Sequence, residues 1–178
     1  EAKTAFLQCL ERDENFRDAH FFLAKIYLAL ARPSDDSKEN YTKAREEINA
    51  VLELDQFHAE SYFLRGVIYE ELGDSGMALS SYKTAVEQNP NYYDAFIRMG
   101  LLYAVKGNEK AIIAYQSALS IRPESTEAHF NLAKYYQDKG HLTKDGTTLD
   151  LAVQNYERVI ELDSLYSLAY LNLGYMYM

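Results

Sequence analysis

The sequence predicts an all-α protein, a right-handed α-solenoid of stacked antiparallel helix pairs with about ten helices. Two ladders of residues carry this prediction. The first consists of tyrosines separated by 42, 34, 33 and 41 residues: Tyr27, Tyr69, Tyr103, Tyr136 and Tyr177. The second consists of alanines separated by the same intervals: Ala2, Ala44, Ala78, Ala111 and Ala152. Each alanine precedes its tyrosine by 25 residues, so one structural unit recurs along the chain.

The tyrosine of each unit ends one face of a predicted first helix. His20, Leu23, Ala24 and Tyr27 stand at i, i+3, i+4 and i+7, which places them on one side of an α-helix. A ring occupies the first of these positions in all five units: His20, Tyr62, Phe96, His129 and Tyr170. A small residue follows the ring four positions later, and we expect it to let a neighbouring helix approach closely.

The alanine of each unit begins the matching face of a second helix. A bulky apolar residue follows it four positions later: Phe6, Ile48, Tyr82, Tyr115 and Tyr156. Glycines Gly73, Gly107 and Gly140 are expected to end first helices, and Pro90 and Pro123 to end second helices.

In chain order these signals predict one array over residues 1–178. It begins with a lone second helix at 2–13 and finishes with a first helix at 167–178. Four helix pairs lie between them, at about 17–58, 59–92, 93–125 and 126–166. Because both end helices lack a partner, we expect a segment of a longer repeat protein, with end-to-end self-association as a possible consequence.

This pattern resembles the tetratricopeptide repeat (TPR), whose signature spans 34 residues. The strongest match consists of a ring, a glycine, two tyrosines, an alanine and a proline in the family's order: Tyr62, Gly66, Tyr69, Ala78, Tyr82 and Pro90. The resemblance covers essentially the whole chain. It implies a non-enzymatic protein-interaction scaffold or adaptor, in which residues of the first helices line a concave groove.

The composition argues against several classes of partner and binding site. With 27 acidic and 18 basic residues the net charge is −9, which argues against a nucleic-acid partner. The single cysteine, Cys9, excludes an intramolecular disulfide and a multi-cysteine zinc site. The longest apolar stretch, 21–31, contains Lys25 and is too short to insert into a membrane. The sequence does not specify a cellular compartment, since it is compatible with both the cytoplasm and the bacterial periplasm.

No group of residues suggests an enzyme, a metal or a cofactor. His20 and His129 occupy the ring position of the repeat and are interpreted as packing residues. Two insertions, 32–43 and 141–150, fall between a first and a second helix. Such insertions often line a binding face, and the alternatives are plain surface loops or helices lengthened by a turn.

The candidate binding residues are those that the repeat core does not need. One position after each ring is a large apolar residue, which we call the apolar rung: Phe21, Phe63, Ile97, Phe130 and Leu171. Carboxylates precede four of these by three residues: Asp18, Glu60, Asp94 and Glu127. Further groove positions follow the rung by four residues: Lys25, Val67, Leu101 and Lys134.

This arrangement predicts an acid-edged apolar groove for a peptide with apolar anchors and basic flanks. The alternative is that the rung serves only contacts between neighbouring first helices. Two further functions stay open. One is an architectural spacer or self-association array without a groove ligand. The other is a regulatory TPR arm of an enzyme whose catalytic domain lies outside this segment.

Overall fold

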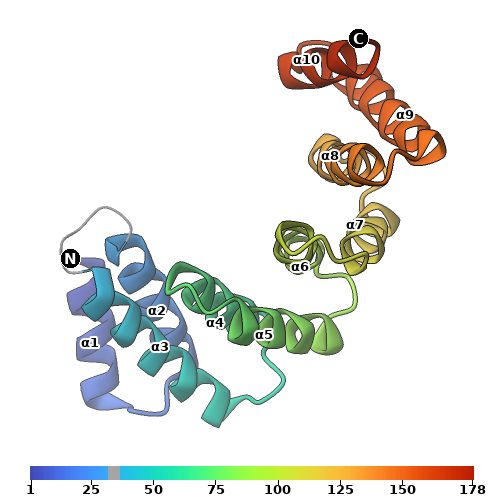
Figure 1. Ribbon diagram of the computed structural model, residues 1–178. Helices are drawn as coiled ribbons and strands as arrows, with labels where there is room; N and C mark the ends of the chain where they lie inside the picture. The colour runs from blue at the N-terminus through green and yellow to red at the C-terminus, as the bar shows by residue number, and fades with distance from the viewer. Residues whose placement is uncertain (32–36) are drawn as a thin grey trace. The chain divides into compact units, whose positions relative to one another are not determined.

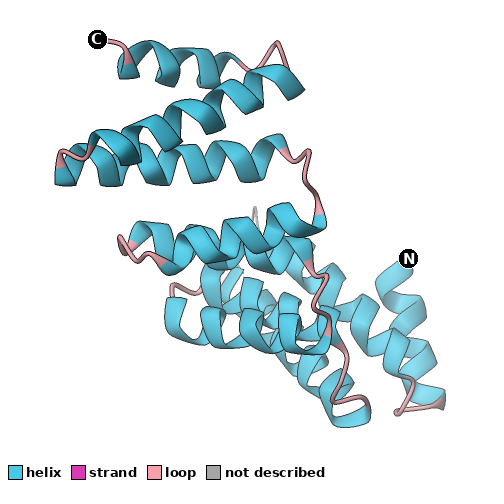
Figure 2. Ribbon diagram, turned by 90° about the vertical axis from the view of Figure 1, so that its right-hand side faces the viewer, coloured by secondary structure: helices cyan, strands magenta, loops and turns pink. Residues whose placement is uncertain are grey.

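The computed structural model describes residues 1–31 and 37–178, and within these residues the chain consists of helices and short connections, without a strand (Figure 1; Figure 2). The all-α prediction is therefore confirmed. Among the described residues, five helices precede residue 91: α1 (Ala2–Arg12), α2 (Arg17–Ala31), α3 (Ser37–Leu54), α4 (Ala59–Glu71) and α5 (Ser75–Gln88). Five follow it: α6 (Tyr93–Val105), α7 (Lys110–Ile121), α8 (Thr126–Thr143), α9 (Gly146–Leu162) and α10 (Ser167–Met176).

The chain divides into two compact units, residues Glu1–Pro90 and Asn91–Met178. The first unit holds α1 followed by the helix pairs α2/α3 and α4/α5. The second holds the pairs α6/α7 and α8/α9 followed by α10. In every pair the two helices pack side by side as an antiparallel hairpin (Figure 1).

Each hairpin is held together by the residues of the two ladders. The pair α2/α3 encloses a core in which Leu23, Ala24, Ala44 and Ile48 have no exposed surface. The small residue, the alanine and the bulky residue are buried in the other pairs as well, where Tyr82, Tyr115 and Tyr156 are at most 1% exposed. Arg65 of α4, at the position of Leu23, is only half-buried. Burial of so much apolar surface along one helix face is the main stabilising term of such a pair.

Glycine at the small position permits the closest of these contacts. A Cβ atom built on Gly66 would lie 2.4 Å from a ring carbon of Tyr82. A Cβ atom on Gly100 would lie equally close to the ring of Tyr115. Any larger residue at these two positions would force the helices apart, which explains why the repeat combines a small residue with a large ring.

The helix ends follow the predicted stop signals with one exception. Gly73 and Gly107 end α4 and α6 with positive φ angles of 80° and 61°, a conformation that favours glycine. Gly140, however, lies inside α8, so its predicted role as a stop was wrong. Its hydrogen atom faces Leu149 of α9, where a Cβ would approach the Leu149 side chain to 2.6 Å.

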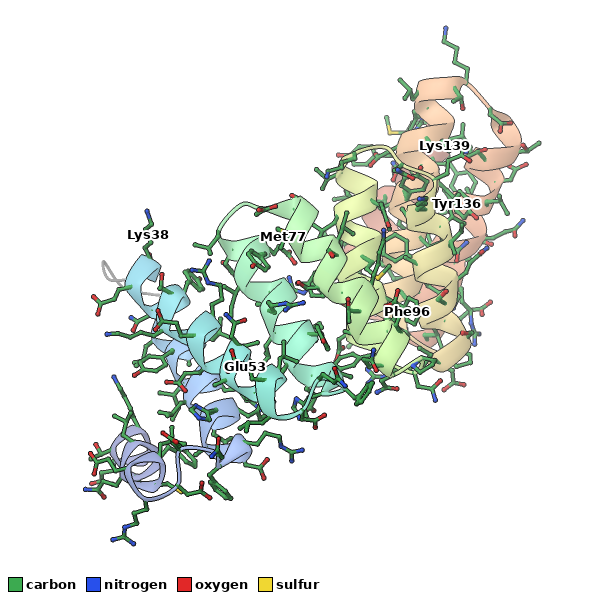
Figure 3. The ribbon with its side chains drawn as sticks, turned by 90° about the horizontal axis from the view of Figure 1, so that it is seen from below. Lys38, Glu53, Met77, Phe96, Tyr136 and Lys139 are labelled. Carbon is green, nitrogen blue, oxygen red and sulfur yellow. The ribbon has the colours of Figure 1, made fainter. Side chains whose placement is uncertain are left out.

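The insertion 141–150 lengthens helices. Helix α8 continues to Thr143, Lys144 makes the turn with a φ of 55°, and α9 begins at Gly146. In the insertion 32–43, residues 32–36 lie outside the described residues, while the remainder forms the first turns of α3. There Lys38 extends away from the helix (Figure 3).

Polar side chains at the ring position also connect first helices to the preceding turns by hydrogen bonds. Tyr62 donates a hydrogen bond from its hydroxyl to the carbonyl of Gln56 at 3.0 Å. The Nε2 atoms of His20 and His129 lie 2.9 and 3.1 Å from carbonyls that are again six residues earlier in the chain. A polar ring at this position therefore satisfies a turn carbonyl that the helices leave without a partner.

Candidate functional site

The apolar rung lies on the first helices, and most of its members also serve packing. Phe63 contacts the ring of Tyr82 at a centroid distance of 5.5 Å. Phe130 lies between two rings, at 5.7 Å from Tyr156 and 5.1 Å from Tyr166. Phe21, Phe63 and Phe130 remain half-buried, so part of each residue is still accessible.

The other two members of the rung differ from these phenylalanines. Ile97 on α6 is only 4% exposed, whereas Leu171 on α10 is 52% exposed. One turn further along, Val67 is buried and Leu101 is half-buried, while Lys25 and Lys134 are exposed. The Lys25 ammonium lies over the Phe21 ring at 5.4 Å, a cation–π contact.

All four predicted carboxylates are exposed: Asp18, Glu60, Asp94 and Glu127. Each lies in the first turn of its helix, where a negative charge is favoured by the helix dipole. They differ in their partners. Asp18 forms an ion pair of 2.8 Å with Arg17, while Glu127 accepts a hydrogen bond of 3.2 Å from the Tyr93 hydroxyl.

In the second unit, two of these carboxylates open onto one hollow. It has a volume of about 690 Å³ and lies between the start of α6 and the turn that joins α7 to α8. It is lined by the continuous segment 122–127, which contains Arg122, Pro123, Glu124, Ser125, Thr126 and Glu127. Two residues of α6, Tyr93 and Asp94, complete the lining. We call it the acidic hollow, because three carboxylates face one guanidinium, a net charge of −2.

The wall of the acidic hollow is ordered by Tyr93. Its hydroxyl lies 2.5 Å from the Ser125 hydroxyl, and the guanidinium of Arg122 stacks over its ring at 4.1 Å. A phenol with the ordinary pKa of 10.0 is already protonated at neutral pH and burial raises the pKa of Tyr93 further, so its hydroxyl can donate to Glu127. Arg122 is held on the ring, which leaves the carboxylates facing the open volume.

A second hollow occupies the corresponding edge of the first unit, where α1 turns into α2. Its volume is about 510 Å³, and it is lined by Asn15, Phe16, Arg17, Asp18, Leu54 and Asp55. Here Arg17 bridges two carboxylates, with N–O distances of 2.8 Å to Asp18 and 3.0 Å to Asp55. The two acidic charges of this hollow are therefore already paired with a cation.

Sequence reasoning found Asp94 and Glu127 but missed Tyr93, Arg122 and Glu124. These three residues lie at a helix start or in a turn between repeats, where the helical period gives no signal. The only sequence hint was the sequence Arg-Pro-Glu at 122–124, which departs from the apolar pattern just after α7.

Other kinds of site receive no support from the structure. Within residues 1–31 and 37–178, no three His, Cys, Asp or Glu side chains gather closely enough to hold a metal ion. Among the helices formed by these residues, none has the length and apolar character needed to cross a membrane.

A family model, described as tetratricopeptide repeat, matches residues 59–92. The chain is 29% identical over 142 residues to the probable UDP-N-acetylglucosamine–peptide N-acetylglucosaminyltransferase SPINDLY of Hordeum vulgare. This alignment covers 79% of the chain but 15% of the Hordeum protein, so the chain spans about a seventh of that relative.

Solved structures agree with the family model. The crystal structure of MamA has a TM-score of 0.76 at 25% identity, covering 91% of this chain and 86% of MamA. YrrB, described as a TPR protein with an unusual peptide-binding site, has a TM-score of 0.71 at 20% identity, covering 94% and 79%. Together with the repeat ladders, these likenesses identify the chain as a tetratricopeptide-repeat protein.

Proposed function

We propose that this TPR chain is a non-enzymatic interaction scaffold whose second unit binds a peptide with apolar anchors and a basic flank. Protein–protein interaction is the role that TPR repeats indicate. In the proposed complex, a lysine or arginine of the peptide enters the acidic hollow, and apolar side chains lie along the rung that begins beside it.

The acidic hollow is the observation that carries the proposal. It holds Asp94, Glu124 and Glu127 around an open volume, and its single cation, Arg122, is stacked on Tyr93. A positive side chain entering this volume would form charge-assisted hydrogen bonds with carboxylates that have few protein partners. An acidic or phosphorylated peptide would be repelled by the same charges.

The apolar side chains of the peptide would contact the same two helices, α6 and α8. Asp94 lies one turn before Ile97 on α6, and Glu127 lies one turn before Phe130 on α8. Because Ile97 is buried, the contact surface consists of Phe130 and the partly exposed Leu101. A half-buried, already packed ring is a favourable anchor, since it loses little side-chain entropy when a ligand covers it.

The first unit is the weaker candidate. Asp18 and Asp55 are already bridged by Arg17, so a basic ligand would have to displace an internal cation. We therefore place the basic flank in the second unit and expect the first unit to contribute at most apolar contacts.

The test is selection of binders from a displayed library of random linear peptides. A variant carrying Asp94→Asn, Glu124→Gln and Glu127→Gln removes the three charges and keeps the side-chain sizes. A matched control carries Asp150→Asn, Glu157→Gln and Glu161→Gln, three exposed carboxylates of α9. We expect peptides enriched in lysine or arginine next to apolar residues to lose about tenfold in affinity with the first variant only.

Two further outcomes decide against the proposal. If both charge variants lose the same affinity, only the net charge matters and the acidic hollow is not the site. If no peptide is enriched although circular dichroism shows folded protein, the rung serves packing and the spacer function gains support. Added salt should weaken a genuine complex, because the contacting charges are exposed.

A second candidate function comes from the Hordeum relative, which is named as a glycosyltransferase. The chain corresponds to a small part of that protein, so a repeat arm beside a catalytic domain is the matching arrangement. Under this function the same acidic hollow would select or position protein substrates. If this chain captures a glycosyltransferase domain that the same gene encodes, the regulatory-arm function is supported. A gene that encodes no such domain would exclude that function.

A further inference from the structure

A small pocket lies in the second unit where α6 ends beside the extended part of α8. Its volume is about 240 Å³. We call it the edge pocket, and its lining comes from α6, the turn after α6, and α8: Ala104, Gly107, Glu109, Tyr135, Asp138, Lys139, Leu142 and Thr143. Sites for small molecules have volumes of about 300–1,000 Å³, so the edge pocket suits a single side chain.

The insertion 141–150 supplies one wall of the edge pocket. Gly140 holds the repeat position of Gly107, four residues after the tyrosine of the first helix. Helix α6 ends before Gly107, whereas α8 continues past Gly140 to Thr143. Leu142 and Thr143 therefore lie beyond the end of a first helix of ordinary length. The insertion has added a wall to a pocket as well as lengthening a helix.

The polar groups that line the edge pocket bind one another. The Tyr135 hydroxyl donates a hydrogen bond of 3.3 Å to the Gly107 carbonyl, and the Thr143 hydroxyl donates one of 2.9 Å to the Lys139 carbonyl. The Lys139 ammonium pairs with Glu109 at 2.6 Å. A polar ligand would have to displace these bonds, whereas an apolar side chain would leave them intact.

Apolar surface and one carboxylate remain for a ligand. Tyr135 is buried and Ala104 is half-buried, while Leu142 is 85% exposed. An apolar side chain inserted beside Leu142 would remove much of its surface from water. Asp138 is exposed and, among the described residues, forms no ion pair. An apolar side chain in a basic peptide is therefore the chemistry that fits the edge pocket.

The edge pocket and the acidic hollow lie at opposite ends of the seam between α6 and α8. Near the starts of these helices, the Tyr93 hydroxyl reaches Glu127 at 3.2 Å. Near their ends, the Tyr135 hydroxyl reaches Gly107 at 3.3 Å. Both sites belong to the second unit, so one peptide lying along the seam would pass both of them.

The distance between the two sites follows from the helices. Asp94 precedes Ala104 by ten residues, and Glu127 precedes Asp138 by eleven. At the helical rise of about 1.5 Å per residue, the sites are about 16 Å apart along the seam. An extended peptide, at about 3.3 Å per residue, covers this distance with about five residues.

We infer that the edge pocket binds an apolar anchor of the same peptide whose lysine or arginine enters the acidic hollow. This inference rests on the proposed function and adds a rule of spacing to it. The basic residue and the anchor lie about five residues apart in the peptide, because neighbouring residues cannot reach both sites. The insertion 141–150 thereby determines which peptides bind, since Leu142 belongs to it.

The probes are fluorescent glycine–serine peptides that carry one arginine and one phenylalanine, either six or two positions apart. In matched peptides serine replaces the phenylalanine. Fluorescence anisotropy measures the dissociation constants. At six positions we expect the phenylalanine peptide to bind about tenfold more tightly than its serine match, because the ring is buried. Two positions span only about 7 Å, so there the ring cannot reach the edge pocket.

Leu142→Asp and Val105→Asp form a matched pair of protein variants. Leu142 and Val105 are 85% and 88% exposed at the ends of α8 and α6, but only Leu142 lines the edge pocket. Circular dichroism checks that both variants keep the helical content of the parent. We expect Leu142→Asp to remove the tenfold preference for phenylalanine at six positions and Val105→Asp to keep it.

Three outcomes would overturn the inference. They are an equal effect of the two variants, a preference for phenylalanine that is the same at both separations, and failure of every probe to bind. The proposed function is tested separately by the variant carrying Asp94→Asn, Glu124→Gln and Glu127→Gln. If that variant weakens all arginine peptides while Leu142→Asp leaves the phenylalanine preference intact, only the edge pocket is wrong. If it weakens none of them, the acidic hollow is not the basic site.

Discussion

Gly66 and Gly174 hold the same place in the repeat and have opposite surroundings. At Gly66 a Cβ atom would meet the Tyr82 ring at 2.4 Å, while at Gly174 it would meet nothing within 4 Å. The difference lies in the neighbouring helix rather than in the first helix itself. It shows that this motif specifies half of a contact, and that the other half must come from a second helix with a ring at the matching position.

The largest effect is expected from removing such a ring. Tyr82 is fully buried and donates a hydrogen bond of 2.7 Å to Glu70. Tyr82→Ala should lower the free energy of unfolding by about 3–5 kcal/mol, as large-to-small core changes do. Tyr170→Ala, on the uncovered face, should change it by less than about 1 kcal/mol. Urea unfolding of dilute protein compares the two, and equal losses would contradict the comparison.

Alkaline pH should lower the stability of the fold through the tyrosines that are buried between helices. Burial raises the pKa of Tyr115 and Tyr156 above the ordinary value of 10.0. A raised pKa in the folded chain means that the stabilisation is complete below the unfolded pKa and is lost as pH rises above it.

Unfolding free energy should therefore fall as pH rises above about 10. The loss should be smaller in a Tyr115→Phe/Tyr156→Phe chain, which has no phenol to ionise at these two positions. Urea titrations at a series of pH values measure this, and an unchanged slope in the double variant would show that other groups control alkaline stability.

Glycine also matters where no helix covers it, but for a different reason. Gly107 has a φ of 61° with nothing within 4 Å of its Cβ position, so strain alone opposes substitution. Gly107→Ala should cost about 1–2 kcal/mol, the penalty of the left-handed conformation. Gly146→Ala, in the first turn of α9 and equally uncrowded, should gain a few tenths of a kcal/mol, about the helix preference of alanine. Thermal unfolding of both variants tests the sign.

The smallest effect is expected at the exposed ion pair between Lys139, one turn after Tyr136 on α8 (Figure 3), and Glu109, at 2.6 Å. The hydrogen bond between them lowers the pKa of Glu109 and raises the pKa of Lys139. Any stabilisation is lost as pH falls through the Glu109 pKa or rises through the Lys139 pKa. Because both groups are solvated, Glu109→Gln should leave the urea midpoint at pH 7 almost unchanged. A clear drop would mean that the pair is a structural element.

The all-α fold was predictable from the sequence, and so were most of the residues that pack between the two helices of each pair. The spacing of Tyr27 and Ala44, repeated along the chain, identified which residues pack, because helical period and burial are linked directly. It could not distinguish the two uses of glycine. Gly107 ends a helix, whereas Gly140 permits close contact with Leu149, and that contact depends on a helix that comes later in the chain.

The candidate site was less predictable than the fold. Exposed carboxylates such as Asp94 and Glu127 follow from helix position, but their shared hollow depends on how the turn before α8 folds back towards α6. The stacking of Arg122 on Tyr93 joins residues 29 positions apart and has no periodic signature. The rung residues illustrate the same limit, since identical positions hold the buried Ile97 and the exposed Leu171.

The most direct test of the central claim compares Gly66→Leu with Gly174→Leu. The claim is that glycine at the small position of a first helix is required only where the ring of a second helix packs on it. Urea unfolding is measured at a concentration where the parent is monomeric. We predict a loss of more than about 3 kcal/mol for Gly66→Leu, because overpacking must displace the Tyr82 ring, and no loss for Gly174→Leu. Equal effects in the two variants would contradict the claim.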